Sequence, residues 1–248
     1  MKPQSRTRCG DIVLEDYGIV VERVHDDPPA TRAETMDIPG RDGTLLREIT
    51  YEPRTITLEC RLFEKRWDDF EKLRDFLVSN LLTYDEMELV VRTHPHEHYM
   101  AYLNSMTEGD RIGGTGIGYL ELEFIASDPW RYGDVRSATI PSGGSTEVLV
   151  YGNLPAVASV SASAAVRSNG STVWGVRFDE GDFVHIATGS SSARAVEIDG
   201  DTRSAKVAGA TSMITLDSNW PVLKPGKHTV RMDEGTGAAT LTWQERSL

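Results

Sequence analysis

Residues 37–63 read DIPGRDGTLLREITYEPRTITLECRLF, and the rest of the chain can be organised around this stretch. Pro39-Gly40 fits a turn in which proline presets φ and glycine accepts a positive φ, and Asp42-Gly43 is a favoured hairpin dipeptide. Beyond these turns, apolar residues alternate with polar ones, as in a strand with one buried face. The inward-facing set is Ile56, Leu58, Cys60 and Leu62. The stretch predicts a strand, a sharp corner and two further strands.

The length of 248 residues predicts two domains, with one large β domain as the alternative. A hydrophobic content of 39% and a charged content of 26% are typical of a soluble protein. No apolar run approaches the roughly 20 residues that a membrane helix needs. The first six residues lack the apolar segment of a secretory signal, so we expect folding in a cytoplasm.

The net charge of −12 is concentrated in the first half of the chain. Residues 1–135 contain 16 Lys and Arg against 27 Asp and Glu, a net charge of −11. Residues 136–248 contain 10 against 11, a net charge of −1. This acidity argues against a nucleic-acid-binding surface, which requires a basic stripe.

The first half is predicted to be β-rich with one helix. The pattern of residues 11–24 indicates a hairpin, with strands at 12–14 and 19–21. A helix is predicted from Arg66 to about Leu82, because its apolar residues recur at spacings of three and four. These residues are Trp67, Phe70, Leu73, Leu77 and Leu81. Further strands are predicted at 87–93, 98–103 and 119–126, with a glycine-rich loop at 109–118.

Cys9 and Cys60 are predicted to be free thiols rather than a disulfide, since Cys60 is in the inward phase of its strand.

The second half is predicted to be an antiparallel sandwich, because short strands alternate with turn signals. Its strands are expected at 147–151, 156–162, 172–178, 183–187, 195–198, 203–207, 227–232 and 238–244. Pro129 and Trp130 end the last strand of the first half. Residues 141–145 have linker chemistry, which places the domain boundary near 135–146. We therefore expect one domain at 1–135 and a second at 136–248.

Candidate chemistry is sparse. His94, His96 and His98 would share a face if extended and could bind a metal ion, but Pro95 favours a solvated turn instead. The acidic turns at 179–182 and 199–201 lack the spacing of a calcium-binding loop. No Gly-x-Ser-x-Gly motif is present, and Cys9 has no histidine near it in the sequence. The residues nominate no catalytic site, no cofactor and no metal, so we do not expect an enzyme.

The order and separation of several short motifs resemble the distal tail protein (Dit) family of long-tailed siphophages, over almost the whole chain. These motifs are Ile38–Gly43, Tyr51-x-x-Arg54, the helix with Trp67, Phe70 and Leu77, the segment Phe124–Tyr132, and Gly152–Ala156. The resemblance implies a β-rich belt domain with one helix, followed by a galectin-like antiparallel sandwich. It also implies a ring of six copies, possibly with a second ring stacked on it, at the end of a non-contractile tail in the virion.

The implied partners are the tail tube, the tape measure, and tail-associated lysins or receptor-binding proteins, and no membrane. The acidic first domain would surround a channel through which DNA passes without specific binding. By the same resemblance, Gly40 and Gly43 shape the corner and Arg41 makes a fixed ion pair or hydrogen bond. The assembly candidates are Pro39, Gly40, Arg41, Asp42, Gly43, Arg54, Pro129 and Trp130.

A second class of function stays open at this point, namely a carbohydrate-binding or adhesion module that does not form rings. Trp174 and Trp243 lie within predicted strands, which favours the core or an interface. Trp220, beside Asn219 and Pro221, is the candidate for contact with a sugar or a partner.

Overall fold

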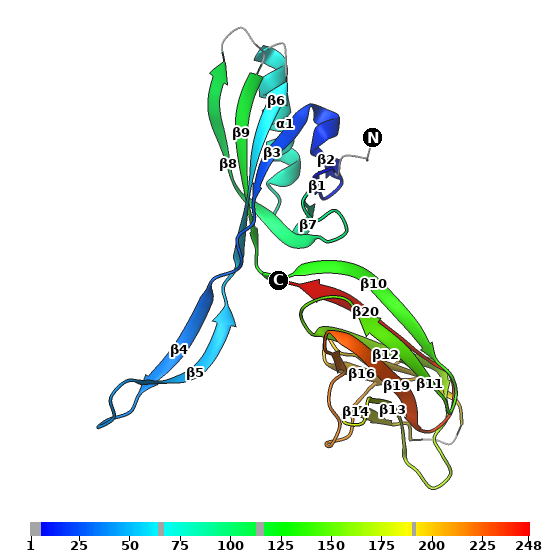
Figure 1. Cartoon of the computed structure of the whole chain (residues 1–248). Coiled ribbons are helices and arrows are strands. Elements are labelled where there is room, and N and C mark those ends of the chain that lie inside the picture. The colour runs from blue at the N-terminus through cyan, green and yellow to red at the C-terminus, as the bar shows by residue number, and fades with distance from the viewer. Residues whose placement is uncertain (1–5, 64–66, 113–116, 190–191) are drawn as a thin grey trace. The chain divides into compact units, whose positions relative to one another are not determined.

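The computed structural model describes residues 6–63, 67–112, 117–189 and 192–248. Its contacts divide the chain into two compact units, one reaching Tyr132 and including Leu248, the other spanning Gly133–Ser247. Figure 1 shows the helices and strands of both units, and each unit has its own hydrophobic core. No helix in the described residues is long and apolar enough to cross a bilayer.

The first unit is built on a seven-stranded sheet in the order β2-β1-β7-β8-β9-β6-β3. Its strands are β1 (Arg8–Cys9), β2 (Ile12–Val13), β3 (Ile19–His25), β6 (Arg54–Phe63), β7 (Met87–Val90), β8 (Tyr99–Ile112) and β9 (Ile117–Ala126). A 3-10 helix, η1 (Leu14–Tyr17), follows β2, and the helix α1 (Trp67–Leu81) follows β6. Two more strands, β4 (Thr31–Asp37) and β5 (Thr44–Tyr51), pair with each other in a separate sheet.

The alternation predicted for residues 55–63 is confirmed in β6. Its inward-facing residues Ile56, Leu58, Cys60 and Leu62 are buried in the core of the unit. The predicted helix is also confirmed: Leu73, Leu77 and Leu81 of α1 are buried in the same core. The side chains of Trp67 and Phe70 lie outside the described residues.

The hairpin predicted for residues 11–24 is wrong. β2 pairs with β1, and β3 pairs with β6, so the two predicted hairpin strands lie at opposite edges of the sheet. Four of the five residues between β2 and β3 form η1, and the fifth, Gly18, ends it in the left-handed conformation with a φ of 75°. Turn residues between two apolar runs do not reveal which strands pair.

The glycine-rich loop is shorter than predicted, because β8 extends to Ile112 and β9 begins at Ile117. Residues 113–116 lie outside the described residues. A strand that was not predicted, β10 (Arg131–Ile140), begins directly after Pro129 and Trp130 and runs into the expected boundary region at 135–146. The tight turn at residues 141–144 follows it, with the Gly144 amide donating to the Pro141 carbonyl oxygen at 3.0 Å.

The second unit consists of two antiparallel sheets that share one core. One has the order β10-β20-β12-β15-β16-β17, with β18 also paired to β12, and the other has the order β11-β19-β13-β14. Their strands are β11 (Ser145–Val150), β12 (Ala156–Ala165), β13 (Val173–Phe178), β14 (Phe183–Ala187), β15 (Arg194–Asp199), β16 (Ser204–Val207), β17 (Ala210–Ser212), β18 (Val222–Leu223), β19 (Gly226–Glu234) and β20 (Ala239–Ser247).

All eight strands predicted for this half are present, and the short strands β17 and β18 were missed. Trp174 and Trp243 are buried in the core, as their positions within strands predicted. The mainly β fold with one α-helix is therefore confirmed in the described residues.

Candidate assembly site

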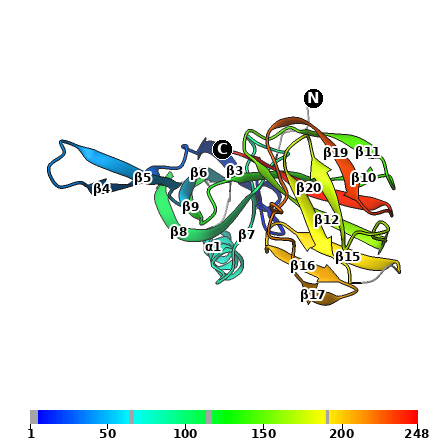
Figure 2. The same cartoon turned by 90° about the horizontal axis from the view of Figure 1, so that it is seen from below.

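The strands β4 and β5 form an arm, defined here as residues 31–51, that runs out from the sheet of the first unit (Figures 1 and 2). Nearly every residue of both strands is exposed. The large apolar side chains on the arm are Met36, Leu45, Leu46, Ile49 and Tyr51, with exposed fractions of 41–55%. An isolated two-stranded hairpin is at best marginally stable in water, so the arm requires a surface against which to pack.

The tip of the arm is the sharp corner predicted from Pro39 to Gly43. Gly40 and Gly43 have φ values of 78° and 80°, the positive region that the turn dipeptides predicted. The corner is a hairpin tip in solvent and not a bend within the packed domain, since a Cβ at either glycine would meet nothing within 4 Å. The Arg41 amide donates to the Ile38 carbonyl oxygen at 3.1 Å, and no ion pair of the Arg41 side chain is present among the described residues.

A β-bulge interrupts the arm halfway along. Glu34 pairs with Glu48, whereas the next residue, Thr35, pairs with Leu46, so Arg47 is left without a cross-strand partner. Bulges redirect a side chain relative to the regular pleat. Arg47 is exposed, and in the part of the chain that the structure describes it makes no ion pair.

The root of the arm is fixed by a buried ion pair. Asp26 precedes β4, Arg54 follows β5, and Arg54 Nε lies 2.7 Å from Asp26 Oδ1. Arg54 also donates to the carbonyl oxygens of Asp26 at 3.3 Å and Pro129 at 3.4 Å. Two segments far apart in sequence are thereby joined where the arm leaves the sheet.

Aromatic contacts complete this root. The Tyr51 and Trp130 rings pack edge to face at 5.0 Å, and the guanidinium of Arg54 lies 5.3 Å from the Tyr99 ring centroid. Tyr99 donates its hydroxyl hydrogen to Asp26 Oδ2 at 2.6 Å. Burial, and secondly this bond to Asp26, raise the pKa of Tyr99. The structure thus brings Arg54, Pro129 and Trp130 together at the root and places Pro39 to Gly43 at the tip.

Sequence reasoning missed the part that Asp26 plays at this root. Its carboxylate also lies near Arg131 at 3.7 Å and His94 at 3.8 Å. In the sequence, Asp26 is simply an acidic residue before Asp27-Pro28-Pro29. Nothing in that context identifies Arg54, 28 residues away, as its partner.

The three histidines of the candidate metal cluster lie in a turn between β7 and β8 and have different surroundings. His94 lies between Asp26 and Glu97, and His96 is exposed. The backbone of His98 pairs with Tyr132, and their rings stack at 5.9 Å. The described residues contain no group of three or more potential ligands placed to hold a metal ion.

A pocket of about 380 Å³ opens on the outer face of the first unit, beside the edge strand β3. It is lined by Glu22, Arg23, Glu59, Cys60, Thr107, Gly109, Tyr119, Leu120 and Glu121. Cys60 and Cys9 are buried free thiols, as predicted. Burial raises the pKa of Cys60 to about 12, so its thiolate is scarce at neutral pH.

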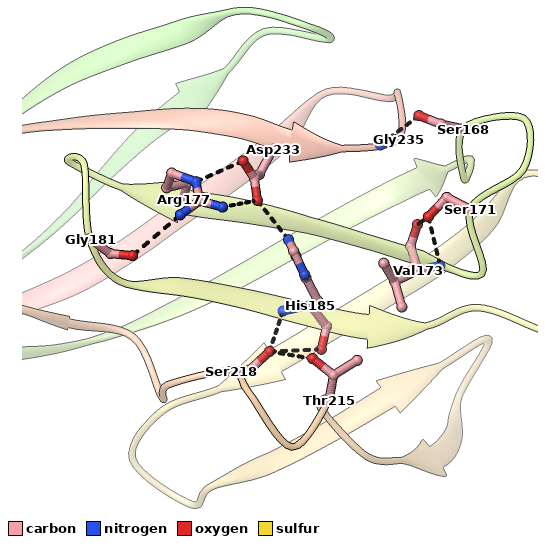
Figure 3. A network of polar contacts seen from close by, with 10 residues as sticks. All are labelled: Ser168, Ser171, Val173, Arg177, Gly181, His185, Thr215, Ser218, Asp233 and Gly235. Carbon is pink, nitrogen blue, oxygen red and sulfur yellow. Dashed lines mark hydrogen bonds and ion pairs between the residues drawn. The ribbon is translucent and has the colours of Figure 1, made fainter.

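The second unit contains a polar network on the outer face of its smaller sheet (Figure 3). Asp233 on β19 accepts two hydrogen bonds from Arg177 on β13, both at 2.8 Å. Its Oδ2 also lies 2.8 Å from His185 Nε2 on β14. The hydrogen bonds from Arg177 hold the pKa of Asp233 below its ordinary value of 3.8. Three strands are joined by one carboxylate.

The network joins the strands of the smaller sheet. The Ser218 hydroxyl bonds to the backbone amide of His185 at 2.9 Å and to Thr215 Oγ1 at 2.8 Å, and not to the imidazole. In this arrangement the imidazole does not contact the serine hydroxyl, as a base that activates a serine must. Gly175 lies beneath His185, and a Cβ there would come within 2.5 Å of the imidazole and 2.1 Å of the Val184 carbonyl oxygen. His185 and Arg177 are 48 and 56 positions from Asp233 in the sequence, so no local pattern could have revealed that they contact it.

Trp220 is half-buried and packs against the core of the second unit. Its neighbour Asn219 donates to Asp182 Oδ1 at 2.8 Å. Both side chains therefore already make contacts within the unit.

Family models of phage tail proteins match both halves of the chain. A family model described as a phage tail protein RIFT-related domain matches residues 7–126, and one described as the C-terminal domain of a siphovirus-type tail component matches residues 155–246. No curated protein sequence matches the chain at the required significance.

Solved structures resemble the whole chain. The crystal structure of the phage SPP1 Dit protein, described as a paradigm of the hub adsorption apparatus in phages that infect Gram-positive bacteria, matches with a TM-score of 0.78 and 18% identity. That match covers 98% of this chain and 99% of the other. The baseplate of phage p2 in its activated conformation matches with a TM-score of 0.48 and 11% identity, over 94% of this chain and 92% of that one.

A sheet bearing an exposed arm, followed by an antiparallel sandwich and matched in both parts by tail-protein models, defines a structural component of a phage tail. The chain belongs to the siphophage distal tail protein family.

Proposed function

We propose that the chain is the structural hub at the distal end of a long non-contractile tail, where copies assemble into a ring, six in number. The observation that carries this proposal is the arm. Its two strands pair only with each other within the described residues, and five large apolar side chains on it are exposed. A second copy of the chain provides the surface that the arm needs.

The root of the arm suits this role. The buried pair of Asp26 and Arg54 fixes the two ends of the arm to the sheet, so the arm is held in place before any neighbour binds. Holding a binding element in position lowers the entropy lost on association. Because the arm and the surface that receives it are different surfaces, the contact is head-to-tail, and such contacts close into rings when the rotation allows.

The ring joins the tail tube and the tape measure to the lysins or receptor-binding proteins of the baseplate, and it acts in the virion without catalysing a reaction. Six first units, each with a net charge near −11 over residues 1–135, surround a channel through which DNA leaves. Like charge keeps the polyanion from adhering to the wall. A glycan-binding role has no comparable support, since Trp220 packs against its own core.

The experiment compares the oligomeric mass of the wild type with that of the double variant Leu46→Ser/Ile49→Ser. Both side chains are more than half exposed, so the variant should fold normally and lose the ring. A matched control is Leu216→Ser, which removes a fully exposed leucine from the second unit. A double variant that assembles as the wild type does would show that the arm is not the assembly element.

A further inference from the structure

We infer that the pocket beside β3 is the docking site for the arm of the neighbouring copy, and that Arg47 of that arm pairs with Glu121 in the pocket. This inference rests on the proposed ring. It specifies which two surfaces of the chain meet when copies assemble.

The pocket contains an unfavourable charge pair that a cation would relieve. Glu59 on β6 and Glu121 on β9 are directly opposite each other in the ladder. Like charges at directly opposed positions destabilise a sheet. Glu59 pairs with Arg23 at 3.7 Å and contacts His25 Nε2 at 2.7 Å. Glu121 is exposed, and no ion pair to it is present within the described residues.

The arm supplies the missing cation. Arg47 is the residue that the bulge leaves unpaired, and it is exposed without an ion pair in the described part of its own copy. Arginine suits a pocket bounded by a carboxylate and an aromatic wall, because its planar guanidinium can pair with the first and stack on the second. Tyr119 provides such a wall and already has Arg61 at 5.7 Å from its ring centroid.

The surroundings of the pocket match the rest of the arm. β3 is the long outer edge of the seven-stranded sheet, with seven residues against two in β2 at the opposite edge. A long uncovered edge is a ready surface for another chain. Val20 on β3 is 41% exposed, and the arm carries Leu46 and Ile49 on either side of Arg47. An apolar contact can therefore flank the ion pair.

The test is a charge exchange between copies. Arg47→Glu and Glu121→Arg should each raise the concentration needed for half assembly by about tenfold or more, because each places like charges together at the contact. The double variant Arg47→Glu/Glu121→Arg should recover most of the wild-type assembly, since the pair is restored with its charges exchanged. Arg32→Glu removes an exposed arginine from the same arm and should leave assembly unchanged.

All four variants alter exposed side chains, so unchanged thermal unfolding verifies their folding. Single variants that assemble like the wild type, or a double variant no better than the worse single one, would overturn the docking site while leaving the ring intact. A wild-type chain that stays monomeric at every concentration would overturn the ring itself, and the contact with it.

Discussion

Arg54 Nε lies 2.7 Å from Asp26 Oδ1, and both side chains are buried, with exposed fractions of 3% and 9%. The pair joins the residues that enter and leave the arm, 28 positions apart in sequence. A buried ion pair contributes little net stability compared with apolar residues, but removing one partner leaves an uncompensated charge. Its role is to fix where the arm departs from the sheet.

Arg54→Met is expected to lower the free energy of unfolding of the first unit by about 3–5 kcal/mol, because the Asp26 carboxylate loses its closest cation in a buried site. Calorimetry of the full chain measures this loss as a lower melting temperature of the first unit. The matched control is Arg23→Met, which breaks the exposed pair with Glu59 and should cost less than about 1 kcal/mol. Equal effects of the two variants would contradict the assigned role of the buried pair.

Leu77→Ala should destabilise the first unit by about 2–5 kcal/mol, since Leu77 on α1 is completely buried against the sheet. The neighbouring residue offers a control: Val78 is 37% exposed, so Val78→Ala should have a much smaller effect. Denaturant titration gives both values. A small loss of stability in Leu77→Ala would mean that α1 does not cover the core of the first unit.

Gly40→Val should weaken assembly while leaving the core of the first unit intact. A branched residue with a φ near 78° is strained by about 1–3 kcal/mol, which distorts the tip of the arm. Light scattering and thermal unfolding together measure the two effects. Gly181→Val, at an open turn position without positive φ, is the control. Intact rings together with an unchanged melting temperature would show that the tip geometry does not matter.

The second unit should lose stability in acid through Asp233. Because hydrogen bonds from Arg177 lower the pKa of Asp233 in the folded state, its stabilising contribution is complete above the ordinary value of 3.8. It is lost as the pH falls through the lower folded-state pKa. Asp233→Asn should therefore reduce stability at neutral pH and flatten the acid limb of the stability profile below 3.8. A profile as steep as that of the wild type would assign the acid sensitivity to other carboxylates.

Local patterns in the sequence predicted where strands and the helix lie better than which strands pair with each other. The alternation around Leu58 and the spacing around Leu77 identified β6 and α1, because each pattern reports burial of one face. The turn chemistry of Gly40 and Gly43 identified a reversal of the chain. It did not show that the reversal is the tip of an exposed arm, since a turn signal is the same in a packed domain and in solvent.

The missed features all depend on partners distant in sequence. The pairing of Asp26 with Arg54, the bulge at Arg47 and the carboxylate of Asp233 between two strands have no local signature. β4 was predicted only as a strand before the corner, without bounds, because an exposed strand lacks the apolar face that reveals buried strands.

The measurement that tests the central claim most directly is the molar mass of the full-length chain in solution, determined by light scattering over a range of concentrations and paired with electron micrographs. A ring of six copies has a mass of six times 27.4 kDa, about 164 kDa, and should appear as closed particles. A mass that stays at 27.4 kDa at the highest concentration, with no rings in the micrographs, would contradict the account.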